Sequence, residues 1–325
     1  MMYANFVYRN GNYIVSSTGR NTLKKQCFRI NEDFKPDFPD SIDLKISNRC
    51  SIGCPYCHEE SIPNGKLADF NEIVKHLDSL PDKPIEVAIG GGDLVVDDES
   101  FLLLVELTKW LNSKNIRVSV TLNEKSFDSE IFTKLKELNL RGLGISLGPD
   151  ITKDRLEYLD KITAYQYLSP TKVFHIILGL FPLDLLKDLL SHEICLWSNR
   201  IRLLFLGYKQ FGRAKQDELP NTIPMFESLI KKSIIMQREV PVVYPSNYIF
   251  GFDNLALEQL NLEKAFIRQE FDSIFLGPEF SCSMYVDAVN GQYAESSTSS
   301  LDSRVSWDSI DILEYFKHDK TSKKD

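Results

Sequence analysis

The stretch NRCSIGCPYCHEES, residues 48–61, contains three cysteines at Cys50, Cys54 and Cys57, in the spacing Cys-x3-Cys-x2-Cys. It directly follows the apolar run Ile42–Ile46, whose length and composition predict a β-strand. A disulfide framework is not expected in a long cytosolic chain, because cellular reductants keep thiols free. Three thiols this close together therefore indicate metal or redox chemistry at the end of a strand.

The overall composition limits the class of protein. With 325 residues, 43% hydrophobic and 26% charged, the chain has ordinary globular values. Its net charge of -8 disfavours bulk nucleic-acid binding, since the overall field repels phosphate backbones. We find no apolar run near the roughly 20 residues of a membrane helix, and the start MMYANFVYRNGNY lacks a secretory signal pattern. We therefore expect a soluble, cytoplasmic protein without a membrane segment.

Short apolar runs alternate with helical patterns through the middle of the chain. The predicted strands are Ile42–Ile46, Ile85–Ile89, Ile116–Leu122, Leu143–Leu147, Val173–Leu178 and Ile201–Leu206. Six βα units predict an α/β fold in which a parallel sheet curls into a partial (β/α)6 TIM-like barrel over residues 41–215.

Two flanking regions break this alternation. Residues 1–40 contain a hairpin pattern around Asn10-Gly11-Asn12, which predicts an N-terminal β-hairpin extension. Residues 216–325 are punctuated by prolines and predict a C-terminal cap. Within that cap, CSMYVDAVNGQYAESS, residues 282–297, predicts a second hairpin with an Asn-Gly turn.

Three kinds of chemistry could use the cysteines. A glutaredoxin-like dithiol at Cys54 and Cys57 would require a helix starting at the first thiol, but Pro63-Asn64-Gly65 would break that helix within about two turns. A zinc site would have to include the adjacent Cys57 and His58, and two neighbouring side chains rarely converge on one ion. A four-iron cluster held by three thiolates fits the spacing better, and it leaves one iron open to bind a small molecule.

This loop resembles that of the radical S-adenosylmethionine (radical SAM) superfamily, whose motif is Cys-x3-Cys-x-aromatic-Cys after the first strand of a partial barrel. Cys50, Cys54 and Cys57 match as ligands of one 4Fe–4S cluster, and Tyr56 matches the aromatic residue near the adenine of S-adenosylmethionine. The resemblance implies reductive cleavage of S-adenosylmethionine to a 5'-deoxyadenosyl radical, which abstracts hydrogen from a substrate. It also implies a small electron donor such as flavodoxin or ferredoxin.

A glycine-rich segment after the second predicted strand extends the resemblance. Gly91, Gly92 and Asp93 stand where the family has Gly-Gly-Glu, which implies backbone and carboxylate contacts to the methionine ammonium. A strand-to-loop turn with a capping Asp is the plainer alternative. Asn123 and Ser146 end the third and fourth strands, where the family sets polar groups toward the ribose and carboxylate.

Four further residues carry two interpretations each. His175 could reach a substrate or be a core histidine, and Cys282 could donate hydrogen or be an inert buried thiol. Lys209 and Arg213 could hold an anionic group at the barrel mouth or be solvated loop charges. Cys27, Cys195 and Cys282 are isolated in the sequence, so we expect one cluster and no auxiliary cluster, although the C-terminal hairpin resembles that of peptide-modifying members.

The substrate remains open between two classes. The C-terminal hairpin, which resembles that of peptide-modifying members but has no cysteine after Cys282, favours a peptide or protein side chain. The short N-terminal extension and the cap favour a nucleotide or another small metabolite. A non-catalytic iron–sulfur sensor is the alternative to an enzyme.

Overall fold

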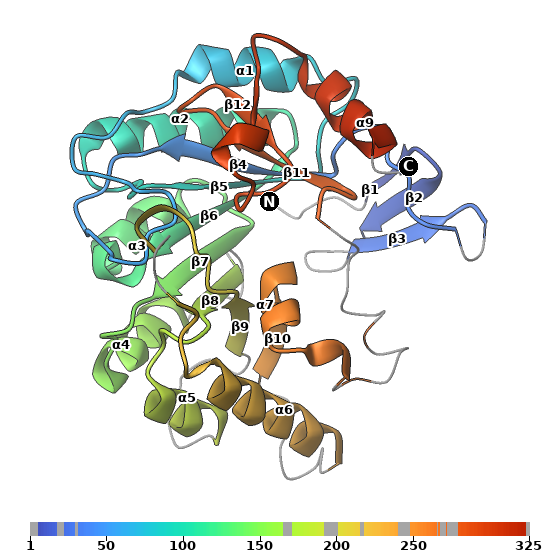
Figure 1. The fold of residues 1–325 in the computed structure, drawn as a ribbon. Coiled ribbons are helices and arrows are strands. Elements are labelled where there is room, and N and C mark those ends of the chain that lie inside the picture. Colours follow the sequence, from blue (N-terminus) through green and yellow to red (C-terminus); the bar gives the residue numbers. More distant parts are fainter. Residues whose placement is uncertain are drawn as a thin grey trace.

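The fold is built on one curved ten-stranded sheet (Figure 1), in the order β10-β9-β8-β7-β6-β5-β4-β11-β12-β13. The computed structural model describes residues 6–17, 23–29, 32–164, 171–191, 201–214, 218–239, 248–264, 266, 271 and 279–322. Its strands are β4 (Ser41–Ser47), β5 (Glu86–Gly91), β6 (Arg117–Asn123), β7 (Gly142–Leu147), β8 (Thr171–Ile177), β9 (Ile201–Leu206), β10 (Tyr248–Phe252), β11 (Ser283–Asp287), β12 (Gln292–Ala294) and β13 (Val305–Ser306). Every neighbouring pair from β10 to β11 is parallel.

The six predicted strands correspond to β4 to β9 and form the partial barrel expected from the sequence. The C-terminal region does more than cover this barrel, because β10 extends the sheet beyond β9 and β11 pairs in parallel with β4. The predicted hairpin is present as β11 and β12. Its parallel pairing with β4 was not predicted, since a hairpin pattern carries no information about which outer strand it joins.

Helices follow the strands and cover the outer face of the sheet (Figure 1). They are α1 (Phe70–Asp78), α2 (Asp98–Ser113), α3 (Ser129–Lys136), α4 (Lys153–Ala164), α5 (Leu183–Leu190), α6 (Ile223–Glu239), α7 (Asn254–Gln259) and α9 (Ile312–Ser322). Aspartates at 69, 97 and 128 begin the first three helices, and each carboxylate accepts a hydrogen bond from a free backbone N–H of the first turn.

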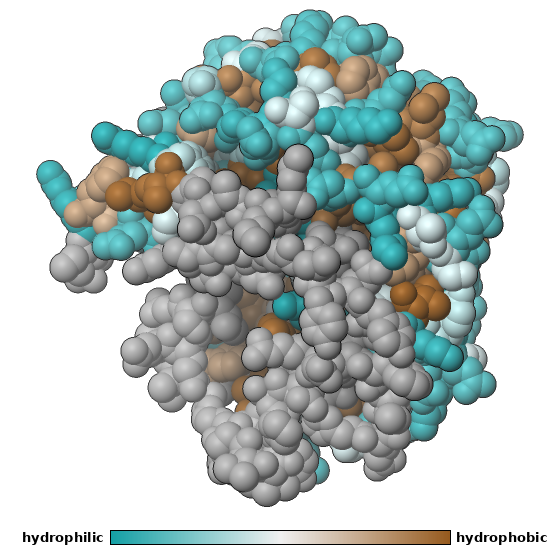
Figure 2. Space-filling view, turned by 180° about the vertical axis from the view of Figure 1, so that it is seen from behind, coloured by the Kyte–Doolittle hydropathy of each residue, from teal (hydrophilic) through white to brown (hydrophobic). Residues whose placement is uncertain are grey.

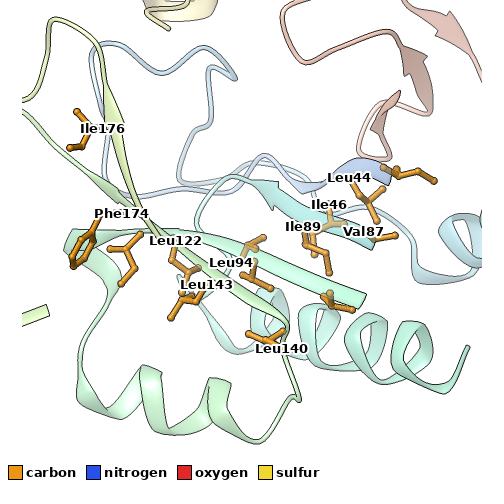
Figure 3. Close-up of a cluster of buried hydrophobic side chains, with 14 of the residues drawn as sticks. Leu44, Ile46, Val87, Ile89, Leu94, Leu122, Leu140, Leu143, Phe174 and Ile176 are labelled. Carbon is orange, nitrogen blue, oxygen red and sulfur yellow. The ribbon is translucent and has the colours of Figure 1, made fainter. Parts of the chain in front are cut away.

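Alternation along β4 separates the core from the barrel interior. Ile42, Leu44 and Ile46 are at most 2% exposed and pack with Val87 and Ile89 of β5 in the core (Figure 3). Successive side chains of a strand point to opposite faces, so Asp43 and Lys45 point into the interior.

Small residues line the barrel interior beside Asp43. Asp43, Ala88, Ser119 and Gly142 are in register on four adjacent strands, and three of these four residues are small. Asp43 is exposed although its strand is paired on both sides. Enclosure by protein nevertheless raises the pKa of this carboxyl to about 6, against the opposing charge of Lys209.

The N-terminal extension is a three-stranded antiparallel sheet, not only a hairpin. It consists of β1 (Phe6–Asn10), β2 (Tyr13–Ser17) and β3 (Leu23–Cys27). Its link to the barrel is the buried Asp40, whose carboxylate accepts hydrogen bonds or an ion pair from Tyr8, Asn10, Tyr13 and Lys25 at 2.6–2.8 Å.

Hydrophilic residues predominate over the described part of the surface seen from behind, and hydrophobic side chains form small separate patches there (Figure 2). Among the helices that the structure describes, none combines the length and the apolar character needed to span a membrane.

Candidate functional site

The three clustered cysteines lie on an irregular segment after β4, which we call the cysteine loop (residues 48–66). The loop folds back on itself: the N–H of Asn48 donates to the Lys66 carbonyl at 2.8 Å, and the N–H of Cys50 donates to the Ile62 carbonyl at 2.9 Å. This segment contains turns and no helix. A helix beginning at Cys54, which the dithiol interpretation requires, is therefore absent.

The thiols of the cysteine loop are free and partly buried. Burial raises the pKa of Cys50, and the nearby Asp93 and Cys57 raise it further. The backbone N–H groups of Ile52 and Gly53 donate to the same sulfur and act in the opposite direction. Backbone donors aimed at a cysteine sulfur are suited to a thiolate ligand, since hydrogen bonds to sulfur stabilise its negative charge.

A zinc site and a four-iron cluster place different demands on these ligands. Within the described ranges, no three or more His, Cys, Asp or Glu side chains are grouped to hold one metal ion. Cys57 and His58, which a zinc site would have to use together, do not complete such a group. A four-iron cluster makes a different demand, because each thiolate binds a different iron at a separate corner.

Arg213 binds the cysteine loop through three hydrogen bonds. It belongs to the short helix η2 (Gly212–Ala214) after β9, and its Nε donates to the Cys54 carbonyl at 2.7 Å. Its Nη1 donates to the Ser61 carbonyl at 2.8 Å, and its backbone N–H donates to the Cys57 carbonyl at 3.1 Å. Arg213 is thus not a solvated loop charge, because its Nε, its Nη1 and its backbone N–H all donate to carbonyls of the cysteine loop.

One nitrogen of this guanidinium remains available beside the loop. Nη2 of Arg213 is buried and has no hydrogen-bond partner among the described residues. A buried unpaired donor is costly, and a sulfide or thiolate of a bound cluster would supply an acceptor. This orphaned donor, together with the free thiols, fits a 4Fe–4S cluster held by Cys50, Cys54 and Cys57.

Gly91 and Gly92 bring the end of β5 against the start of the cysteine loop. A Cβ atom at Gly91 would lie 2.4 Å from the Ser47 carbonyl oxygen, and one at Gly92 would lie 2.2 Å from the Arg49 carbonyl oxygen. Gly91 also has a φ of +124°, which favours glycine. The chain's own backbone therefore requires both glycines, whereas a Cβ at Gly90 would meet nothing within 4 Å.

Asp93 is buried and partly engaged. Its N–H donates to the Arg49 carbonyl at 2.8 Å, which joins it to the cysteine loop. Its carboxylate accepts from the Ser126 hydroxyl at 2.6 Å and from the Val95 N–H at 3.2 Å. The capping role considered from the sequence is present, and acceptor positions remain for a ligand.

Tyr56 points toward the ends of β6 and β7. A Cβ at Gly148, one residue past β7, would lie 3.4 Å from its hydroxyl. Burial and the nearby thiol of Cys54 raise the pKa of Tyr56, and the carboxylates of Asp150 and Glu124 add to this effect. The aromatic side chain and the thiol therefore share one rim of the barrel.

Asn123 and Ser146 are opposite each other in the pairing of β6 with β7, at the carboxyl ends of these strands. The Asn123 side chain accepts from the Lys125 N–H at 3.0 Å and so caps the next turn. Ser146 is also in register with His175 of β8. The ring of His175 lies over β7, since a Cβ at Gly144 would be only 2.4 Å from it, and burial lowers the pKa of His175 to about 4.

The remaining candidates lie away from the loop thiols or are engaged elsewhere. Lys209 donates to the Ser297 hydroxyl at 2.8 Å. Cys282 is 7% exposed and lies at the amino end of β11, where it packs with Tyr13 and Val15 of the N-terminal sheet. The carboxyl ends of the strands carry the cysteine loop, so Cys282 is a buried thiol at the opposite end. Cys195 falls outside the described residues.

A family comparison agrees with this geometry. Residues 44–168 match the model of the Radical SAM superfamily. These residues form a radical SAM domain. The matched range contains the three loop cysteines, Asp93, the second half of β4 and the strands from β5 to β7. Domains of this family use a 4Fe–4S cluster and S-adenosylmethionine.

Relatives in sequence match only part of the chain. The chain is similar to "Uncharacterized protein MJ0907" of Methanocaldococcus jannaschii, with 28% identity over 134 residues that cover 39% of this chain and 43% of the relative. It is also similar to "Probable GTP 3',8-cyclase" of Methanothermobacter marburgensis, with 26% identity over 154 residues that cover 42% and 48%. Each match spans less than half the length of the curated relative.

The fold is similar to that of a solved protein over a longer range. Streptococcus suis SuiB, in a crystal structure bound to precursor peptide SuiA, aligns with a TM-score of 0.57 and 14% identity. The alignment covers 87% of this chain and 65% of SuiB. At this identity the similarity concerns the fold, and it extends beyond the radical SAM domain into the flanking regions.

Proposed function

We propose that this protein is a radical SAM enzyme that modifies a peptide or protein side chain. The observation that carries the proposal is the free three-cysteine loop at the carboxyl end of β4, within the range that matches the family model. When bound, the cluster and S-adenosylmethionine supply an electron and a 5'-deoxyadenosyl radical for hydrogen abstraction. The protein's own contribution is to bind, orient and shield these groups.

In this proposal Cys50, Cys54 and Cys57 each bind one iron, and Arg213 holds the loop that carries them. Asp93 accepts a hydrogen bond from the methionine ammonium, while the backbone at Gly91 and Gly92 approaches the methionine closely.

Tyr56 would lie against the adenine of bound S-adenosylmethionine, and Asn123 and Ser146 would face its ribose and carboxylate. All these residues lie at the carboxyl ends of parallel strands, the usual location of active sites in barrels of this kind.

The fold similarity to SuiB supports a peptide substrate. The crystal structure of SuiB contains the bound precursor peptide SuiA, and the alignment with SuiB covers 87% of this chain. An extended peptide with one side chain inserted into the interior is the substrate geometry that we favour.

A nucleotide is the second candidate substrate. The relative described as a probable GTP 3',8-cyclase supports it, with 26% identity over 154 residues. The two candidate substrates differ in charge. A nucleotide triphosphate is negatively charged and has to approach a chain of net charge -8, so its binding requires local positive charge.

The test is anaerobic reconstitution with iron and sulfide, followed by dithionite and S-adenosylmethionine. We expect visible iron–sulfur absorption and formation of 5'-deoxyadenosine, with flavodoxin or ferredoxin able to replace dithionite. An intact cluster without this product would indicate the sensor alternative. Stimulation by a short peptide encoded beside the gene would support the peptide substrate, whereas stimulation by GTP alone would support the nucleotide.

A further inference from the structure

Four charged side chains form a buried ion network next to the cysteine loop. Lys45 Nζ lies 2.6 Å from Glu59 Oε2 and 3.2 Å from Asp287 Oδ2. Arg304 Nη1 lies 3.0 Å from the same Asp287 oxygen. All four side chains are at most 9% exposed, so water screens these charges weakly.

The network joins three distant parts of the chain. Lys45 belongs to β4, and Glu59 follows Cys57 by two residues in the cysteine loop. Asp287 and Arg304 belong to residues 283–307, which we call the C-terminal segment and which contains β11, β12 and β13. The parallel register of β11 with β4 sets Asp287 directly opposite Lys45, so the pairing of these strands builds the network.

Both oxygens of Glu59 are engaged. Lys45 occupies one, and the Tyr285 hydroxyl donates to the other at 2.8 Å. His58 Nε2 lies 3.3 Å from that second oxygen. The side chain of Glu59 is therefore fixed by β4 and by the C-terminal segment at the same time.

Stability alone does not account for this arrangement. Removing several charges from water is costly, and apolar residues of similar size commonly serve a core as well or better. A buried network does, however, specify one geometry, because each member has partners in only one arrangement. The geometry specified here is the position of the loop segment that carries Cys57.

We propose that Glu59 is a positioning residue for the cluster, and that the C-terminal segment acts through it. The backbone N–H of Arg213 donates to the Cys57 carbonyl, and the side chain of Glu59, two residues further along the loop, is held by Lys45 and Tyr285. This inference rests on the proposed function, and it goes further by assigning the C-terminal segment a role in retaining the cluster.

The charges of the network give this role an electrostatic signature. Two cations and two anions balance, so replacing Glu59 with a neutral group leaves excess positive charge near the cluster. Positive charge favours reduction, and net charge and hydrogen bonding are among the factors that set iron–sulfur potentials. Glu59→Gln should therefore raise the midpoint potential, whereas Tyr285→Phe, which removes one hydrogen bond and no charge, should leave it unchanged.

The experiment uses the full chain, reconstituted anaerobically, with Glu59→Gln, Tyr285→Phe and Glu60→Gln as variants. Glu60 is the exposed neighbour of Glu59 and provides the matched control. Iron release to a chelator is followed by absorbance, and the midpoint potential is followed by electron paramagnetic resonance during redox titration. We expect Glu59→Gln to release iron about tenfold faster than wild type, with a smaller acceleration for Tyr285→Phe and none for Glu60→Gln.

The proposal would be overturned if Glu59→Gln released iron at the wild-type rate and had the wild-type midpoint potential. It would also be overturned if Glu59→Gln and Glu60→Gln changed these two quantities equally. If Glu59→Gln does not fold, Tyr285→Phe decides, and release at the wild-type rate overturns the proposal. A wild-type chain that binds no cluster would instead overturn the proposed function, and this inference with it.

Discussion

Asp93 allows a sharp test of the proposed cofactor site, because its carboxylate is only partly used by the protein. The residue is 6% exposed, and it accepts one hydrogen bond from Ser126 and one from Val95. An ionised carboxylate has about four acceptor positions, so roughly two remain for a ligand ammonium. Loss of one charge-assisted hydrogen bond costs about 1.5–3 kcal/mol, so Asp93→Ala should raise the Kd for S-adenosylmethionine by about 10- to 150-fold.

The assay is anaerobic calorimetric titration of cluster-loaded protein with S-adenosylmethionine, with the visible spectrum and iron content as checks. Ser126→Ala removes one support of the carboxylate without changing its charge and should weaken binding by less than Asp93→Ala. Asp98→Ala is the matched control, since this exposed carboxylate lies in the first turn of α2. An unchanged Kd in Asp93→Ala with an intact cluster, or equal weakening in Asp98→Ala, would refute the reasoning.

Three further predictions concern the cluster and the interior. Each of the variants C50A, C54A and C57A should lose both the cluster and the cleavage of S-adenosylmethionine, so retained activity in one of them would contradict the ligand assignment. Iron and sulfide should approach about four of each per chain, and C27A, C195A and C282A should not change this; a value near twice that, lowered by one of these changes, would indicate a second cluster. Burial lowers the pKa of His175 from 6.5 to about 4. Between these pH values His175 is therefore protonated in the unfolded chain and neutral in the folded chain. The free energy of unfolding should therefore fall by up to about 3 kcal/mol as the pH falls through this range. Denaturant titrations should show that H175Q lacks this pH dependence, and the same pH dependence in wild type and H175Q would contradict the prediction.

The barrel strands and the cysteine loop were predictable from the sequence because their signals are local. Apolar runs predicted β4 to β9, and the spacing of three cysteines within eight residues predicted their common use. Arg213 carried no comparable signal, since its partners are loop carbonyls more than 150 residues away. A charge within a buried strand, Lys45, was a visible anomaly, but its partners Asp287 and Arg304 become neighbours only when β11 pairs with β4.

The interior residues near Asp43 differ from those of a closed barrel, in which bulky branched side chains fill the interior in layers. The positions in register with Asp43 on β5, β6 and β7 are the small residues Ala88, Ser119 and Gly142, whereas β11 places Tyr285 opposite Asp43. A Cβ at Gly142 would meet the Ser119 hydroxyl at 2.7 Å, but a Cβ at Gly90 would meet nothing within 4 Å. The open position therefore lies near the carboxyl end of β5, which is the end of the sheet that carries the cysteine loop.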